Sequence, residues 1–253
     1  MTRRILSLVL GLVAAIGAGT LAIAVTLPAR ADTQLCDQFA STPIQSGRFV
    51  VQNNNWGDTI QQCTTATATG FTVTSGNHNK PTNGPPGSYP SIFLGCHFGT
   101  CSTASGLPAP IASLRDVTTS VNFKITAGQF DAAYDIWYDP TARTNGQVTG
   151  AEVMIWVNHA GAPQPIGSKI ATATLAGATW DVFSGNIGWN VISYVRQQRA
   201  TSFSGSVIPF EKDAQARRLI DPAWFLTSVQ FGFEPWVGGP GLAADNFAVT
   251  ITR

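Results

Sequence analysis

The segment Ala151-Glu152-Val153-Met154-Ile155-Trp156-Val157-Asn158 alternates between two kinds of side chain with a period of two residues. This period predicts a β-strand, because successive side chains of a strand point to opposite faces of its sheet. One face is apolar and suits a core: Val153, Ile155 and Val157. The other face carries a carboxylate, a thioether, an indole and an amide: Glu152, Met154, Trp156 and Asn158. A face of this composition predicts the floor of a cleft that binds a sugar.

Two further segments repeat this design. Segment 229–234 alternates apolar side chains with more polar ones and ends at Glu234, which Pro-Trp follows. Segment 134–138 places Asp135 and Trp137 on the face opposite to an isoleucine and two tyrosines. If Trp137 belongs to the cleft, Asp135 does so too, and it then lies where it can hydrogen-bond Glu152 or alter its ionisation. The other interpretation is an exposed aspartate at the edge of a sheet.

The rest of the chain predicts an all-β domain. Short segments rich in Val, Ile, Thr and aromatic residues alternate with Gly, Pro and Asn turns, which is typical of two packed antiparallel sheets in a sandwich or β-jelly roll. Examples of the predicted strands are 48–52, 70–74, 120–125, 132–138, 151–158, 168–173, 178–183, 190–196, 227–234 and 246–252. We also predict one α-helix over 210–220 and a long ordered loop over 76–90.

The N-terminal residues 1–31 have the features of a secretory signal. Arg3-Arg4 precedes an apolar run from Ile5 to Leu27, and Ala29-Arg30-Ala31 offers small residues at a cleavage position. An uncleaved membrane anchor is the alternative, because the run is long enough to span a bilayer. We therefore expect a secreted, extracellular protein whose residues 32–253 form a single catalytic domain with no membrane contact after cleavage.

Composition narrows the range of partners. Charged residues make up 11% of the chain, against about 25% in an average soluble domain, and the net charge is +1. This balance argues against nucleic acid as a partner. We find no phosphate loop, no metal motif and no Ser-His-Asp arrangement. The expectation is a monomer without a cofactor or a metal.

Four cysteines lie in the first half of the exported part: Cys36, Cys63, Cys96 and Cys101. An even number in an oxidising compartment predicts disulfides, for which the sequence allows three pairings. We favour Cys36 with Cys63 and Cys96 with Cys101. A metal site at Cys96, His97 and Cys101 is the alternative, but no second ligand pair has zinc spacing.

The chain contains only three glutamates: Glu152, Glu211 and Glu234. Glu211 lies among charged residues of the predicted helix, so a solvated charge explains it. A single strand glutamate facing away from a core is usually solvated as well. However, both Glu152 and Glu234 lie close to tryptophan on the polar face of a strongly apolar strand. Two carboxylates across a groove are what glycoside hydrolysis requires, one as proton donor and one as nucleophile or base, although aspartate can also serve.

A separate sugar-binding feature is the run Gln52-Asn53-Asn54-Asn55-Trp56. Amides and an aromatic plate are a usual means of holding a pyranose ring. The alternative is a core tryptophan beside a turn.

Together, five motifs resemble glycoside hydrolase family 12, the secreted endo-β-1,4-glucanases of bacteria and fungi. They follow in the order of that family across the exported chain: Asn53-Asn54-Asn55-Trp56-Gly57, Gly95-Cys96-His97, Tyr134-Asp135-Ile136-Trp137, Glu152-Val153-Met154-Ile155-Trp156 and Gly232-Phe233-Glu234-Pro235-Trp236. The resemblance implies a β-jelly roll with one helix, a concave sheet that forms an open cleft for β-1,4-glucan, and no cofactor.

It also implies a retaining double displacement, with Glu152 as nucleophile, Glu234 as general acid/base and Asp135 as the acidic neighbour of the nucleophile. Trp56 matches a glucose-stacking tryptophan. Further cleft residues are implied as substrate contacts: Asn54, His97, Met154, Trp156 and, with Asp135, Trp137. The cysteines fall where bacterial members carry two disulfides in the pairing favoured above. Segment 184–199 departs from the family pattern, so a contact by Asn190 is not assigned.

Two other functions stay open. A secreted glucan-binding lectin would keep the jelly roll without cleaving, but it needs no opposed acids. A xyloglucan-specific endoglucanase of the same family, or an enzyme acting on xylan, would differ in the loops that border the cleft.

Overall fold

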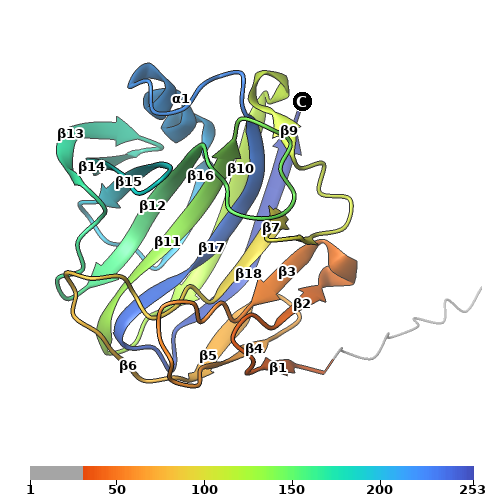
Figure 1. Cartoon of the computed structure of the whole chain (residues 1–253), viewed down its shortest axis with the longest axis vertical. Coiled ribbons are helices and arrows are strands. Elements are labelled where there is room, and N and C mark those ends of the chain that lie inside the picture. The colour runs from red at the N-terminus through yellow and green to blue at the C-terminus, as the bar shows by residue number, and fades with distance from the viewer. Residues whose placement is uncertain (1–30) are drawn as a thin grey trace, which may run out of the picture.

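The computed structural model describes residues 31–253, and the predicted signal segment 1–31 lies outside them except for its last residue. The larger of two sheets has the strand order β13-β14-β15-β12-β11-β17-β7-β3-β2. Its long strands curve side by side across the molecule (Figure 1). They are β2 (Ser41–Ile44), β3 (Phe49–Gln52), β7 (Ser91–His97), β11 (Gly128–Asp139), β12 (Ala151–Ala160), β13 (Ser168–Leu175), β14 (Ala178–Asn186), β15 (Asn190–Arg196) and β17 (Phe225–Gly238). Three short strands pair with it: β6 (His78–Asn79), β8 (Thr100–Cys101) and β9 (Ala109–Pro110).

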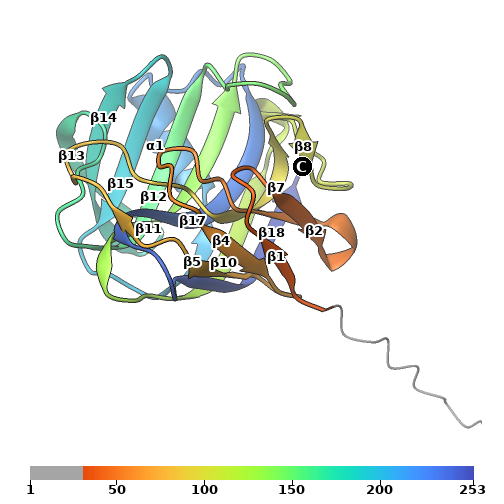
Figure 2. The same ribbon diagram turned by 60° about the horizontal axis from the view of Figure 1, so that its bottom comes forward.

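The smaller sheet has the order β1-β4-β5-β18-β10-β16. Its strands are β1 (Thr33–Leu35), β4 (Cys63–Ala66), β5 (Phe71–Ser75), β10 (Asp116–Lys124), β16 (Ser202–Ser206) and β18 (Ala243–Thr252). Figure 2 shows this sheet stacked against the larger one. Two 3₁₀ turns, Gln45–Gly47 and Ile111–Ser113, and one α-helix complete the described elements. The predicted β-jelly roll of two packed sheets is confirmed.

The core lies between the sheets and is built from the apolar face of each alternating strand. The ring of Phe231 on β17 lies 5.0 Å from Tyr134 on β11 and 5.1 Å from Phe123 on the smaller sheet, between ring centroids. Val153, Ile155 and Val157 of β12 belong to the same core, as predicted. Burying each side chain of this size contributes about 1.5–3 kcal/mol to the free energy of unfolding. A shift of one residue would expose these side chains, so the core face fixes the register of these strands. The opposite face of the larger sheet points away from this core, and we call it the cleft face after the predicted cleft.

One strand pair runs against the prediction of purely antiparallel sheets. β15 pairs with β12 in parallel, while the other pairings among the described strands are antiparallel. The two hairpin reversals from β13 to β14 and from β14 to β15 bring β15 back in the direction of β13, and it then lies beside β12. The turn between β14 and β15 therefore reaches the edge of the cleft face.

The helix α1 (Ile208–Ala216) begins two residues earlier and ends four residues earlier than predicted. Arg218 has a φ of 62°, a left-handed conformation that ends the helix. The prediction that Glu211 is solvated is wrong, because this side chain is only 4% exposed and accepts a hydrogen bond from the hydroxyl of Tyr138 at 3.1 Å. The first turn of α1 packs on the core through Phe210, and Glu211 follows it inward. Burial raises the pKa of Glu211 to about 7.

Both favoured disulfides are present, Cys36–Cys63 and Cys96–Cys101. The second joins β7 to β8, where the two cysteines face each other in register. The strand prediction missed β7, although its Ile-Phe-Leu run is strongly apolar. Within residues 31–253 the structure has no helix long and apolar enough to cross a membrane.

Candidate active site

Four carboxyl groups gather on the cleft face of the larger sheet. Glu152 on β12 lies opposite Trp137 of β11, and Glu234 on β17 lies opposite Asp131 of β11. Residues directly opposite each other in an antiparallel pair share a face. Asp135, two residues before Trp137 and four after Asp131, therefore faces the same way. The strand β11 thus lies between the two glutamates and contributes two aspartates to their surroundings.

The carboxylate of Glu152 is buried, with 8% of the residue exposed. Its Oε2 accepts a hydrogen bond from the indole Nε1 of Trp189 at 3.0 Å. Burial raises the pKa of Glu152, the hydrogen bond from Trp189 opposes this rise, and the charge of Glu234 adds to it. Hydrogen bonding from Asp135 also lowers the pKa of Glu152. Asp135 is thus the acidic neighbour that the sequence predicted.

Glu234 has a different neighbour, which the sequence analysis missed. Burial raises the pKa of Glu234, and Asp131 on the next strand opposes this rise. Asp131 itself is fully buried, and its pKa is raised well above the usual range by burial and then by the charge of Glu234. Neither oxygen of Asp131 has a partner in ordinary hydrogen-bond geometry, so the two carboxyls are close neighbours that share protons without a well-formed hydrogen bond. The signal was present, because extending the period of two backward from Asp135 reaches Asp131.

No cation balances these carboxyls. None of the ion pairs formed within residues 31–253 involves any of the four acids. Tyr89 lies among them, donating its hydroxyl to the carbonyl of Ala133 at 3.1 Å, and burial followed by the carboxylate charges raises its pKa. Four acids without a cation hold protons in common and titrate as one coupled set. The pKa values of all four acids are raised, so the site retains carboxyl protons near neutral pH. Acid-assisted nucleophilic substitution requires such a proton donor beside an ionised carboxylate.

No group of three or more His, Cys, Asp or Glu side chains within residues 31–253 is arranged to hold a metal ion.

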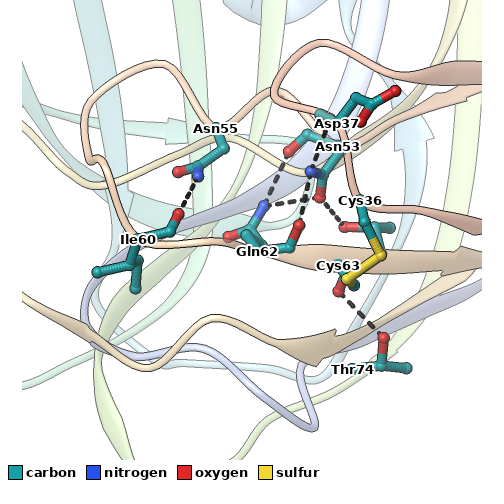
Figure 3. The surroundings of a disulfide bond; sticks show 9 residues. Cys36, Asp37, Asn53, Asn55, Ile60, Gln62, Cys63 and Thr74 are labelled. Carbon is teal, nitrogen blue, oxygen red and sulfur yellow. Dashed lines mark hydrogen bonds between the residues drawn. A yellow bond between two sulfur atoms is a disulfide. The ribbon is translucent and has the colours of Figure 1, made fainter.

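The amide run before Trp56 has a mainly structural role. Asn53 donates to the carbonyls of Asp37 and Gln62, and Asn55 donates to the carbonyl of Ile60. Figure 3 shows these bonds beside the Cys36–Cys63 disulfide. The prediction that this amide run holds a sugar is wrong for these two residues, because burial commits their amides to the loop.

Trp56 and Asn54 remain candidates for sugar contact. Trp56 is 45% exposed, so its ring is free to stack on a ligand. Asn54 adopts a φ of 41°, and its carbonyl accepts from the backbone N–H of Tyr89 at 2.9 Å. This hydrogen bond holds the loop that carries Trp56 against the segment just before β7.

His97 is the last residue of β7. Its Nδ1 is 3.0 Å from Oε1 of Gln52, and the amide of Gln52 donates to Ser91 and to Gln230. Burial lowers the pKa of His97 to about 4, so the imidazole is neutral above that pH. The neutral imidazole thus belongs to a fixed chain of amides and hydroxyls.

Met154, Trp156 and Trp137 also lie on the cleft face but are largely buried. Met154 and Trp156 pack in a second apolar cluster with Ala133, Val191 and Trp236.

Asn158 was predicted on this face, and the structure corrects that prediction. A register shift after Ala132 places Asn158 opposite Ala132, a core residue, and its amide donates to the carbonyl of Ala200 at 2.7 Å.

Comparison with known proteins finds a matching family and several relatives. The family model described as Glycosyl hydrolase family 12 matches residues 47–252. A probable cellulase Cel12b of Mycobacterium tuberculosis is 35% identical over 149 residues, which cover 58% of this chain and 98% of the relative. A probable xyloglucan-specific endo-beta-1,4-glucanase A of Aspergillus terreus is 30% identical over 243 residues, covering 89% of this chain and 90% of the relative.

Solved structures of related sequence have the same fold. The native structure of the endo-1,4-beta-glucanase CelB2, a cellulase, is 46% identical, with a TM-score of 0.84, and the match covers 87% of this chain and 100% of that one. The endoglucanase cel12A from Rhodothermus marinus is 41% identical, with a TM-score of 0.83, and covers 87% and 99% of the two chains.

Proposed function

The chain belongs to glycosyl hydrolase family 12, and from this premise we propose that it is a retaining endo-β-1,4-glucanase that hydrolyses internal β-1,4-glucosidic bonds. The observation that carries the proposal is the pair Glu152 and Glu234 on the cleft face, of which Glu152 is buried and Glu234 is partly buried, with the charge of Glu234 acting on Glu152. A glucan-binding lectin would have no use for two opposed acids that are costly to bury.

The proposed reaction has two steps. Oε1 of Glu152 attacks the anomeric carbon, the glycosidic C–O bond breaks, and Glu234 gives its proton to the leaving oxygen. Glu234, now ionised, then removes a proton from water, which attacks the same carbon and releases Glu152 from its ester. Retention follows from two inversions, and it requires the two carboxyl groups to be about 5 to 5.5 Å apart rather than about 6.5 to 9.5 Å.

The substrate is proposed to be a β-1,4-glucan held across the larger sheet. The exposed ring of Trp56 would stack on one glucose, and the floor of Gln52 and His97 would bind hydroxyls. Xyloglucan is the second candidate, because a relative named as xyloglucan-specific matches over nine-tenths of its own length. A branched glucan needs a cleft open at its rim, so the two candidates differ in the side groups that the cleft admits.

The test is hydrolysis of carboxymethyl-cellulose, barley β-glucan, xyloglucan and xylan by the wild type and by Glu152→Gln. We expect cleavage of one or more glucans that vanishes in the variant, and a β-anomer as the first product by proton NMR. Glu211→Gln is the matched control, since it makes the same change in a buried glutamate outside the cleft. Glucan binding without cleavage by the wild type would refute the catalytic proposal.

We also propose that the protein is exported and acts as a monomer outside the cell. The two disulfides support an oxidising compartment. N-terminal sequencing of protein from the culture medium should find a start near Asp32, and light scattering should give the mass of one chain.

A further inference from the structure

The indole of Trp189 makes a hydrogen bond to the proposed nucleophile that the mechanism above does not use. Its Nε1 donates to Oε2 of Glu152 at 3.0 Å. We propose that Trp189 is a positioning residue, which holds Oε2 so that Oε1 of Glu152 is the oxygen that attacks the anomeric carbon. This inference rests on the proposed function and assigns a role to the segment 184–199, where the resemblance to the family is weakest.

The turn that carries Trp189 is braced by its own hydrogen bonds. Gly188 has a φ of 105°, which L side chains rarely adopt. The N–H of Gly188 donates to the side chain of Asn186 at 3.1 Å, and the amide of Asn186 donates to Asn190 at 3.0 Å. The N–H of Ile187 donates to the carbonyl of Trp189 at 3.1 Å. The turn thus presents Trp189 in one defined place.

The strand that follows the turn fixes this place relative to the nucleophile. In the parallel pairing of β12 with β15, Glu152 lies beside Val191, two residues after Trp189. The ring of Trp189 lies 5.8 Å from that of Trp137, the residue opposite Glu152 on the other side. Trp189 also packs against the apolar cluster that contains Met154 and Trp156. Strands on both sides of Glu152 therefore hold the donor in line with one carboxylate oxygen.

An indole N–H suits this role because it donates a hydrogen bond and cannot accept one. It stabilises the ionised carboxylate before attack and then the carbonyl oxygen of the glycosyl ester, so it stays bonded through both steps. The other groups that face Glu152 are Asp135 on β11, Glu234 on β17 and Tyr89 before β7, while β15 contributes Val191. None of these carries a positive charge. Loss of the indole donor is therefore not compensated by a cation.

The test compares Trp189→Phe with Trp156→Phe in the purified enzyme acting on the glucan that the wild type cleaves best. Trp189→Phe keeps an aromatic ring and removes the donor. We expect kcat to fall about tenfold with little change in KM, and the acid limb of the kcat/KM profile to move up by about one pH unit. Trp156→Phe removes a buried N–H that has no partner, so its acid limb should stay in place. Trp189→Leu is the second variant and should show the same shift.

The outcomes separate this inference from the function on which it rests. A wild type that cleaves no glucan, or a Glu152→Gln variant that still cleaves, refutes the proposed function. If the wild type cleaves and Glu152→Gln does not, an unmoved acid limb in folded Trp189→Phe and Trp189→Leu overturns the role of Trp189. A shift of the same size in Trp156→Phe would also overturn it, because packing alone would then explain the effect.

Discussion

Glu152 and Glu234 lie on the same face of the larger sheet, yet their neighbours differ. Glu152 accepts a hydrogen bond from the indole of Trp189 and is supported by Asp135. The only neighbour with a comparable effect on Glu234 is Asp131, a buried carboxyl outside hydrogen-bond geometry. Both glutamates have a neighbouring carboxyl that can share a proton, but Glu152 also has a fixed N–H donor, which favours its ionised form. This difference supports the proposed roles, in which Glu152 is the nucleophile and Glu234 is the proton donor. The support comes from the hydrogen bond of Trp189 and not from the order of the raised pKa values, which are about 8 for Glu152 and about 7 for Glu234.

The largest expected effect comes from exchanging each glutamate for glutamine and varying the leaving group. Glu152→Gln should lose on the order of 10⁴-fold or more in turnover on glucans and on aryl cellobiosides alike, because no nucleophile remains. Glu234→Gln should lose about 10²- to 10⁴-fold on glucans. On an aryl cellobioside with an acidic phenol it should still show a burst of phenol, because that leaving group needs no proton.

Stopped-flow absorbance measures the burst, and the unmodified enzyme provides the reference amplitude. A burst from Glu152→Gln and none from Glu234→Gln would exchange the two roles and refute the comparison.

The next largest expected effect is on folding stability. The acids around Glu152 and those around Glu234 contribute to it with the same sign. The pKa values of Glu152, Glu234, Asp131 and Asp135 are all raised, mainly by burial. The folded chain then binds more protons than the unfolded chain above the unfolded pKa of about 4, so the free energy of unfolding falls as the pH rises from there through the folded pKa values. Each group contributes up to about 1.4 kcal/mol per pH unit.

Urea unfolding between pH 5 and pH 8 measures this slope, and Asp131→Asn should make it shallower. Asp139 provides the control, because hydrogen bonds from Thr141, Thr149 and Arg143 outweigh its burial and lower its pKa to about 2. Its contribution is fully present above the unfolded pKa, so Asp139→Asn should lower stability evenly across this range. An unchanged slope in Asp131→Asn would show that Asp131 is ionised in the folded protein.

The sequence predicts the fold and the grouping of the acids on one face well, because both depend on a period of two. That period separates core from cleft on β11, β12 and β17, and it brings Glu152, Glu234 and Asp135 to one face. It fails at Asn158, where a register shift of the strand moves the side chain to the other face.

Other contacts depend on tertiary structure. Trp189 reaches Glu152, 37 residues earlier in the sequence, because β15 pairs in parallel with β12. Glu211 is surrounded by charges in the sequence, but the packing of α1 on the core buries it. The sequence analysis could have found Asp131. It did not, because the predicted strand began at Ala132, the residue after Asp131, whereas β11 begins at Gly128.

The smallest effect tests whether the two aspartates support different limbs of the pH profile. Burial raises the pKa of both glutamates. Asp135 opposes this rise at Glu152, and Asp131 opposes it at Glu234 from outside ordinary hydrogen-bond geometry. Asp135→Ala should therefore move the acid limb of kcat/KM to higher pH, because the nucleophile must be ionised, and lower kcat/KM about tenfold at pH 6. Asp131→Ala should move the alkaline limb to higher pH by less than one unit, because the acid then keeps its proton longer.

Asp135→Asn and Asp131→Asn retain an amide donor at each position and should shift the same limbs less. If both alanine variants moved the same limb, each aspartate would act on the whole coupled set, and the division between a nucleophile end and an acid end would not hold.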